Sequence, residues 1–82
     1  MSEKFLPFVL NAYDKEVVLL IIAKYGLDPM TALNRFVKSE THRMLSDPDL
    51  EMWEFGYPGI LDIWEAEQVT GDPRNSVYIR GE

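Results

Sequence analysis

Residues that start or stop helices recur along the whole chain and divide its 82 residues into short segments. Asp and Ser cap the first turn of a helix, Pro suits its first positions, and Gly suits the residue after its last turn. Prolines near expected helix starts are Pro29, Pro48 and Pro58, and glycines at expected helix ends are Gly26, Gly56 and Gly71. This pattern of capping residues, prolines and glycines predicts short helices joined by short loops.

The composition is that of a compact domain, since 46% of the residues are hydrophobic. We therefore expect one domain over residues 1–82, mainly α, with three to five short helices and an extended C-terminal tail at 77–82. The chain has no cysteine, which excludes disulfides and thiolate chemistry. So short a chain must bury most of its apolar side chains, either in the monomer or against a partner.

The first 26 residues contain the longest apolar run, Val17–Ala23. At seven residues it is far below the roughly 20 that span a membrane. Residues 1–13 fit either an extended arm or a helix with Pro7 in its first turn. Residues 14–25, between a capping Asp14 and Gly26, favour a helix over a buried strand, apolar on every side. With no secretory signal or membrane span apparent, we expect a cytoplasmic protein.

Residues 28–46 predict one amphipathic helix, capped by Asp28, with an apolar stripe. The stripe is Met30, Leu33, Phe36, Val37, Met44 and Leu45. Ser46 or Asp47 then caps a short helix ending at Gly56, whose inward residues are Leu50 and Trp53. A further helix over 57–70 has an inward face of Ile60, Ile63, Trp64 and Val69, while Asp62, Glu65 and Glu67 point elsewhere. Residues 71–76 read as a turn.

The excess negative charge lies in one block. Residues 47–72 hold eight acidic side chains and neither Lys nor Arg, while the whole chain has a net charge of −6. The same block holds Trp53, Phe55, Tyr57 and Trp64. One interpretation places the rings in the core and the acids in water. The other makes the block a docking face for a basic partner, since rings provide contact area and charge of one sign steers encounter.

Catalytic and metal-binding patterns are missing from the sequence. The one histidine, His42, falls on the charged side of its helix, where we expect it to face solvent rather than act as a base. Asp47, Asp49 and Glu51 resemble the start of a calcium loop, but Met52 and Pro58 replace its required Gly and Glu. We expect no catalytic residue, metal or cofactor. Arg35, Lys38 and Arg43 form the only basic cluster, too small for us to expect nucleic-acid binding.

Residues 27–76 hold a set of residues whose spacing matches a known group of proteins. They are Ala32-Leu33, Phe36, Ser39, Thr41, Met44-Leu45, Trp53, Trp64-Glu65 and the run from Thr70 to Ser76. In this part the chain resembles a family of short helical bacterial proteins encoded beside genes for ADP-ribosyltransferase-like toxins. The resemblance implies a helical fold and an antitoxin-type role, and it transfers no site residue.

These observations predict a non-catalytic protein-interaction module that binds a basic protein partner through its acidic, aromatic C-terminal half. The residues expected to touch the partner are Trp53, Glu54, Phe55, Glu65 and Glu67. Arg74 is expected to pair with a nearby acid and order the tail. The alternatives are a homo-oligomer, such as a homodimer, driven by apolar surface on residues 5–22, and a small DNA-binding regulator using the basic cluster.

Overall fold

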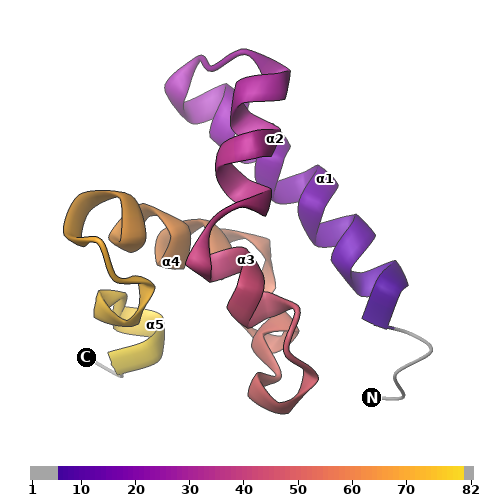
Figure 1. Ribbon diagram of the computed structural model, residues 1–82, viewed down its shortest axis with the longest axis vertical. Helices are drawn as coiled ribbons and strands as arrows, with labels where there is room; N and C mark the ends of the chain where they lie inside the picture. Colours follow the sequence, from indigo (N-terminus) through magenta and orange to yellow (C-terminus); the bar gives the residue numbers. More distant parts are fainter. Residues whose placement is uncertain (1–5, 81–82) are drawn as a thin grey trace.

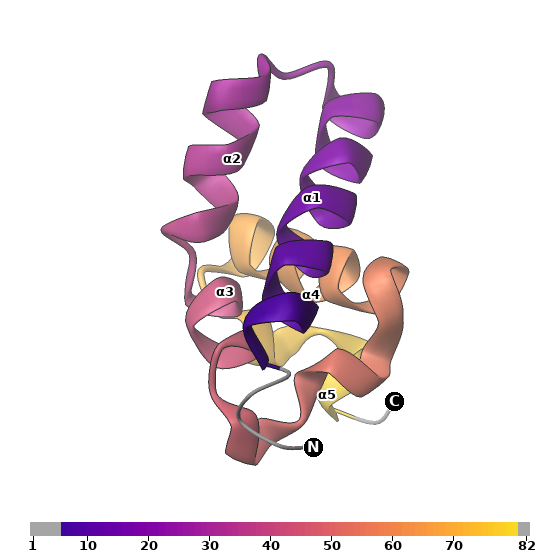
Figure 2. The same cartoon turned by 90° about the vertical axis from the view of Figure 1, so that its right-hand side faces the viewer.

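The computed structural model describes residues 6–80, which form helices and loops and contain no strand (Figures 1 and 2). The elements are α1 (Leu6–Tyr25), α2 (Pro29–Val37), α3 (Glu40–Leu45), the 3-10 helices η1 (Pro48–Leu50) and η2 (Met52–Phe55), α4 (Gly56–Thr70), the 3-10 helix η3 (Pro73–Asn75) and α5 (Val77–Arg80). The prediction of a mainly α fold with three to five helices is confirmed.

Helix α1 joins two segments that we expected to be separate elements, residues 1–13 and residues 14–25. Residues 6–13 take the helical alternative and continue without a break into 14–25, giving a helix of 20 residues with Pro7 in its first turn. The expected capping role of Asp14 is therefore wrong, because this residue lies in the middle of the helix. Gly26 does end α1, at a positive φ of 66° that glycine adopts without strain. Residues 1–5 lie outside the described part of the chain.

The amphipathic helix expected over 28–46 is instead two helices, α2 and α3. Its predicted start is right, since the Asp28 side chain accepts a hydrogen bond from the Thr31 N–H at 3.1 Å and Pro29 follows. The break comes at Ser39, whose hydroxyl accepts from the His42 N–H at 3.1 Å. A residue that caps a new helix cannot continue the old one, so the chain turns here.

Helices α1 and α2 form an antiparallel hairpin that stands on a base of α3, α4 and α5 (Figure 2). Helix α4 crosses the molecule beneath the hairpin and contacts α1, α3, η3 and α5. The core lies where the hairpin meets this base. Its buried apolar residues are Tyr13, Val17, Val18, Ile21, Ala32, Phe36, Met44, Leu45, Met52, Ile60, Ile63 and Trp64.

Several residues predicted to face inward are exposed. Leu19 is 51% exposed, so the apolar run of α1 is not buried on every side. Met30, Val37, Leu50 and Val69 are 63%, 36%, 47% and 85% exposed. Each of these four lies in the first or last turn of its helix. We attribute their exposure to that position, where a side chain extends past the neighbouring helix that covers the middle turns.

The C-terminal segment docks on the base, but as a turn of helix rather than as an extended tail. Ser76 is buried, and its hydroxyl donates to Asp62 Oδ2 at 2.6 Å. The Tyr78 ring then packs edge-on against Phe55, with 6.0 Å between ring centroids. Within residues 6–80, no helix has the length and apolar character needed to cross a membrane.

Candidate functional site

The acidic block divides into two parts that the structure uses differently. Its C-terminal part, residues 62–72, contains Asp62, Glu65, Glu67 and Asp72, and all four carboxylates have partners within the chain. Its N-terminal part is the segment 47–54, here called the acidic segment. This segment contains the remaining four acids and no basic residue.

Glu67 holds helix α3 in place. Its Oε1 atom accepts from the Thr41 N–H at 2.8 Å and the Thr41 hydroxyl at 2.7 Å, and its Oε2 atom accepts from the Glu40 N–H at 3.0 Å. These amides open α3 and have no partner within that helix. Both carboxylate oxygens are therefore engaged in the fold, although sequence reasoning placed Glu67 at a partner surface.

Glu65 is also engaged in the fold. Its Oε2 atom lies 2.6 Å from Lys24 Nζ and accepts the Tyr25 hydroxyl, so it ties α4 to the end of α1. Partial burial would raise the pKa of the Glu65 carboxyl, but the hydrogen bonds from Lys24 and Tyr25 outweigh it and hold this pKa below its usual value. The same contact raises the pKa of Lys24. Glu65 thus carries little uncompensated charge.

The acidic segment is the part of the block that faces solvent. Asp47 is half-buried and caps η1 by accepting from the Asp49 N–H at 3.0 Å. Asp49, Glu51 and Glu54 are exposed. The only other exposed acid among residues 6–80 is Asp28. Most of the exposed negative charge among residues 6–80 therefore comes from eight consecutive residues, and Asp49, Glu51 and Glu54 form no ion pair with a cation in that range.

Backbone geometry distinguishes the same segment. Glu51 has φ 50° and ψ 35°, and it is the only non-glycine residue with positive φ among residues 6–80. It joins η1 to η2 in the left-handed region, which costs a side-chain-bearing residue of order 1 kcal/mol. The left-handed turn between the two short helices is thus maintained at an energetic cost.

Apolar groups adjoin the exposed acids. Leu50 is 47% exposed and Tyr57 is 37% exposed. Trp53 is half-buried, and its carbonyl accepts the Tyr13 hydroxyl. Phe55 is half-buried against Tyr78. The sequence analysis placed Leu50 inward, although the alternation of Asp49, Leu50 and Glu51 was a signal that this stretch has no continuous inward face. It left Tyr57 open between the core and the surface.

The five residues expected at a partner surface therefore do not share one neighbourhood. Trp53, Glu54 and Phe55 lie together on η2, next to the acidic segment. Glu65 contacts α1, and Glu67 contacts α3. The acidic segment and η2 expose carboxylates and parts of aromatic rings, which can contact a cationic surface. Glu65 and Glu67 instead stabilise the packing of helices.

His42 does not face solvent as expected. Its side chain is 18% exposed, its Nε2 atom lies 2.7 Å from Asp14 Oδ1, and its ring meets Phe36 edge-on with 5.2 Å between centroids. The ring thus links α3 to α1 and packs on α2. Its position also explains Asp14, which serves as a tertiary partner rather than a helix cap.

The structure also shows the contacts of Arg74 and of the basic cluster. The prediction that Arg74 pairs with nearby acids is confirmed, since its guanidinium lies 3.3 Å from Asp72 and 3.5 Å from Glu40. Of the basic cluster, Arg43 donates to Glu40 at 2.9 Å through Nε and is thereby partly neutralised. Among the described residues, no group of three or more His, Asp or Glu side chains is arranged to hold a metal ion.

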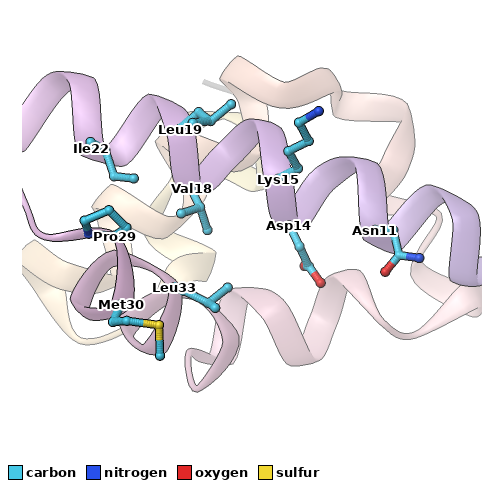
Figure 3. A pocket seen from close by; sticks show the side chains of 9 residues that line it. All are labelled: Asn11, Asp14, Lys15, Val18, Leu19, Ile22, Pro29, Met30 and Leu33. Carbon is cyan, nitrogen blue, oxygen red and sulfur yellow. The ribbon is translucent and has the colours of Figure 1, made fainter.

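A second surface feature is an apolar groove between α1 and α2, of about 430 Å³ (Figure 3). Val18, Ile22 and Leu33 line it, and Leu19 and Met30 stand at its edges. Asp14 and Lys15 lie toward one end. We call this feature the hairpin groove.

Comparison with known proteins returned no match: no protein-family model, curated protein or solved structure is significantly similar to the chain.

Proposed function

We propose that the chain is a non-catalytic protein-interaction module that binds a basic protein partner through the acidic segment and the adjoining side chains of η2. The observation that carries this proposal is the division of the acidic block. The carboxylates at 62–72 are held by the fold, whereas Asp49, Glu51 and Glu54 are exposed and form no ion pair within residues 6–80.

Charge and apolar surface have separate roles in the proposed complex. Like-signed exposed charge increases the rate at which an oppositely charged surface is encountered. Leu50 and Tyr57, together with the exposed parts of Trp53 and Phe55, provide the apolar contact that keeps the complex together. Of the eight residues of the segment, only Leu50, Met52 and Trp53 are apolar, and Met52 is buried, so the contact area is that of a small interface.

The partner we propose is a small basic enzyme of toxin type, as implied by the resemblance over residues 27–76. The module would neutralise it by covering its active site. No residue of the module needs to react, because occlusion by a charged, apolar surface is sufficient to exclude a substrate.

Affinity capture from the native cell with the full chain tests the proposal. Two single variants form a matched pair: Glu54→Lys changes the acidic segment, and Glu16→Lys makes the same charge change on α1, where Glu16 is half-buried. We expect a basic protein that is retained by the wild type and by Glu16→Lys and is depleted by Glu54→Lys. Equal retention by both variants would contradict a docking role for the segment.

Self-association is the second candidate function, and the hairpin groove is the observation that favours it. Leu19 and Met30 expose apolar surface beside the groove, on the helix hairpin that includes most of residues 5–22. Light scattering at micromolar concentration tests it. A dimer that becomes a monomer in Leu19→Asp, but not in the control Leu50→Asp, supports this candidate, and a wild-type monomer rejects it.

A further inference from the structure

A second hollow lies on the other side of the hairpin, between the hairpin and the C-terminal half of α4. It measures about 350 Å³, and its lining includes Tyr25, Leu27, Arg35, Trp64, Gln68 and Val69. We call it the Arg35 pocket. This volume is within the range of pockets that bind small organic molecules. The pocket belongs to neither the acidic segment nor the hairpin groove.

Two aromatic residues, Trp64 and Tyr25, line the pocket. Trp64 is 3% exposed, Tyr25 is 47% exposed, and the two rings lie 6.2 Å apart between centroids, with the planes inclined by 58°. Leu27 adds half-buried apolar surface, and Val69 is almost fully exposed. This arrangement suits a planar ring, which gains contact by stacking or edge-on packing.

The lining of the pocket includes Arg35, a positively charged residue with an exposed side chain. The Trp64 indole Nε1–H donates to the Arg35 carbonyl at 3.5 Å, which places the Arg35 backbone against the edge of the ring. The Arg35 guanidinium has no hydrogen bond or ion pair with any residue in the range 6–80. The other charged residue of the lining, Glu65, is balanced by Lys24 at 2.6 Å and accepts the Tyr25 hydroxyl.

We propose that the Arg35 pocket binds an organic carboxylate that carries an aromatic ring. The guanidinium would hold the carboxylate, since its planar fork matches two carboxylate oxygens. The rings of Trp64 and Tyr25 would hold the aromatic part, and the exposed Gln68 amide can add a hydrogen bond. This inference is independent of the proposed function, because it uses different residues and a different ligand.

Two kinds of ligand carry such a carboxylate and ring, namely a free aromatic acid and the C-terminal residue of a peptide. Both present one carboxylate close to one ring. The experiment therefore includes a small probe and a peptide probe, each with a matched amide that lacks the negative charge.

The test is a titration of the full ¹⁵N-labelled chain followed by NMR. The small probes are N-acetyl-L-phenylalanine and its amide, and the peptide probes are Gly-Gly-Phe and its C-terminal amide. The reporters are the indole N–H of Trp64 and the backbone amides of Gln68 and Val69. The chain has two tryptophans, so Trp53→Phe assigns the indole signals.

We expect saturable shifts of these reporters at millimolar probe, with each carboxylate binding about tenfold more tightly than its amide, as one charge-assisted contact implies. Arg35→Gln should abolish this preference, and Arg35→Lys should keep part of it. Both variants change an exposed side chain, so the fold should be retained, which the remaining amide signals verify. Val69→Glu, which adds negative charge beside the pocket, should weaken only the carboxylates.

The tighter of the two carboxylate probes identifies the source, because a peptide terminus gains or loses contact at the pocket rim relative to the free acid. Equal shifts from carboxylates and amides in the wild type would overturn the proposal. It would also be overturned if none of the probes shifts the Trp64 indole signal, or if Arg35→Gln leaves the preference for carboxylates intact.

Discussion

The Glu67 carboxylate on α4 caps helix α3 from outside that helix, because its Oε1 atom accepts both the backbone N–H and the hydroxyl of Thr41. Thr41 is fully buried. Since the two residues are 26 positions apart, this contact joins the middle of the chain to its C-terminal half.

Replacing Glu67 should therefore destabilise the whole domain. We expect Glu67→Ala to lower the free energy of unfolding by about 2–3 kcal/mol, because it leaves the Thr41 donors without their acceptor in a buried place. Urea denaturation followed by circular dichroism measures this. The control is Glu54→Ala, which changes an exposed acid and should stay within about 0.5 kcal/mol of the wild type. Equal effects of the two changes would show that Glu67 has no structural role.

Replacing Gly59 by alanine tests how tightly α4 packs, because the packing determines whether the protein becomes more or less stable. A Cβ atom at this position would lie 2.9 Å from Phe55 Cβ and 3.2 Å from Tyr78 Cε1. Alanine normally stabilises a helix interior by about 1 kcal/mol over glycine. Here we expect Gly59→Ala to destabilise the protein by about 1–2 kcal/mol, because overpacking outweighs that gain. A rise in the urea midpoint would mean that the contact between α4 and α5 is looser than described.

The ion pair between Glu40 and Arg43 predicts how stability depends on pH. Hydrogen bonding by Arg43 lowers the pKa of the Glu40 carboxyl to about 2, from its usual 4.5. The folded state thus favours the ionised carboxyl, and this contribution is complete above about pH 4.5 and is lost as the pH falls toward 2. Glu65, whose pKa is also lowered, acts in the same direction.

Denaturation curves collected from neutral pH down to acid should show this loss. Glu40→Gln should flatten the profile between about pH 4.5 and 2, where the wild type loses stability. Because Arg43 is exposed and Glu40 is only half-buried, high salt should weaken the effect. A Glu40→Gln profile parallel to that of the wild type would show that the pair contributes nothing to stability.

Local signals in the sequence were sufficient to predict the fold class and several helix boundaries. Asp28-Pro29 and Gly71 are examples, because a cap or a left-handed glycine acts within one turn. The break at Ser39 was missed, since the apolar residues on either side keep helical spacing across it. Ser39 followed by Glu40 was the available signal, as a capping hydroxyl and an acid open many helices.

The division of the acidic block could not be predicted in the same way. Whether Glu65 and Glu67 face a partner or the fold depends on Lys24, Tyr25 and Thr41, which are 26 to 41 positions away in the chain. No local pattern encodes such contacts. The same holds for His42, because its helical position predicted exposure while Asp14 on another helix determines its environment.

A test of the docking surface must use acids that the fold does not need. Charge reversal at Glu65 or Glu67 would disrupt contacts with α1 or α3 and would confuse loss of binding with loss of structure. Asp49, Glu51 and Glu54 are exposed, and their carboxylates have no intramolecular partner in the described part of the chain.

The most direct measurement is the rate of association with the captured basic partner as a function of ionic strength. It compares the wild type with the triple variant Asp49→Lys, Glu51→Lys and Glu54→Lys. We expect the wild-type rate to fall steeply with salt, and the triple variant to associate at least about tenfold more slowly at low salt with a flat or reversed salt dependence. An unchanged rate and slope in the triple variant would contradict binding through the acidic segment.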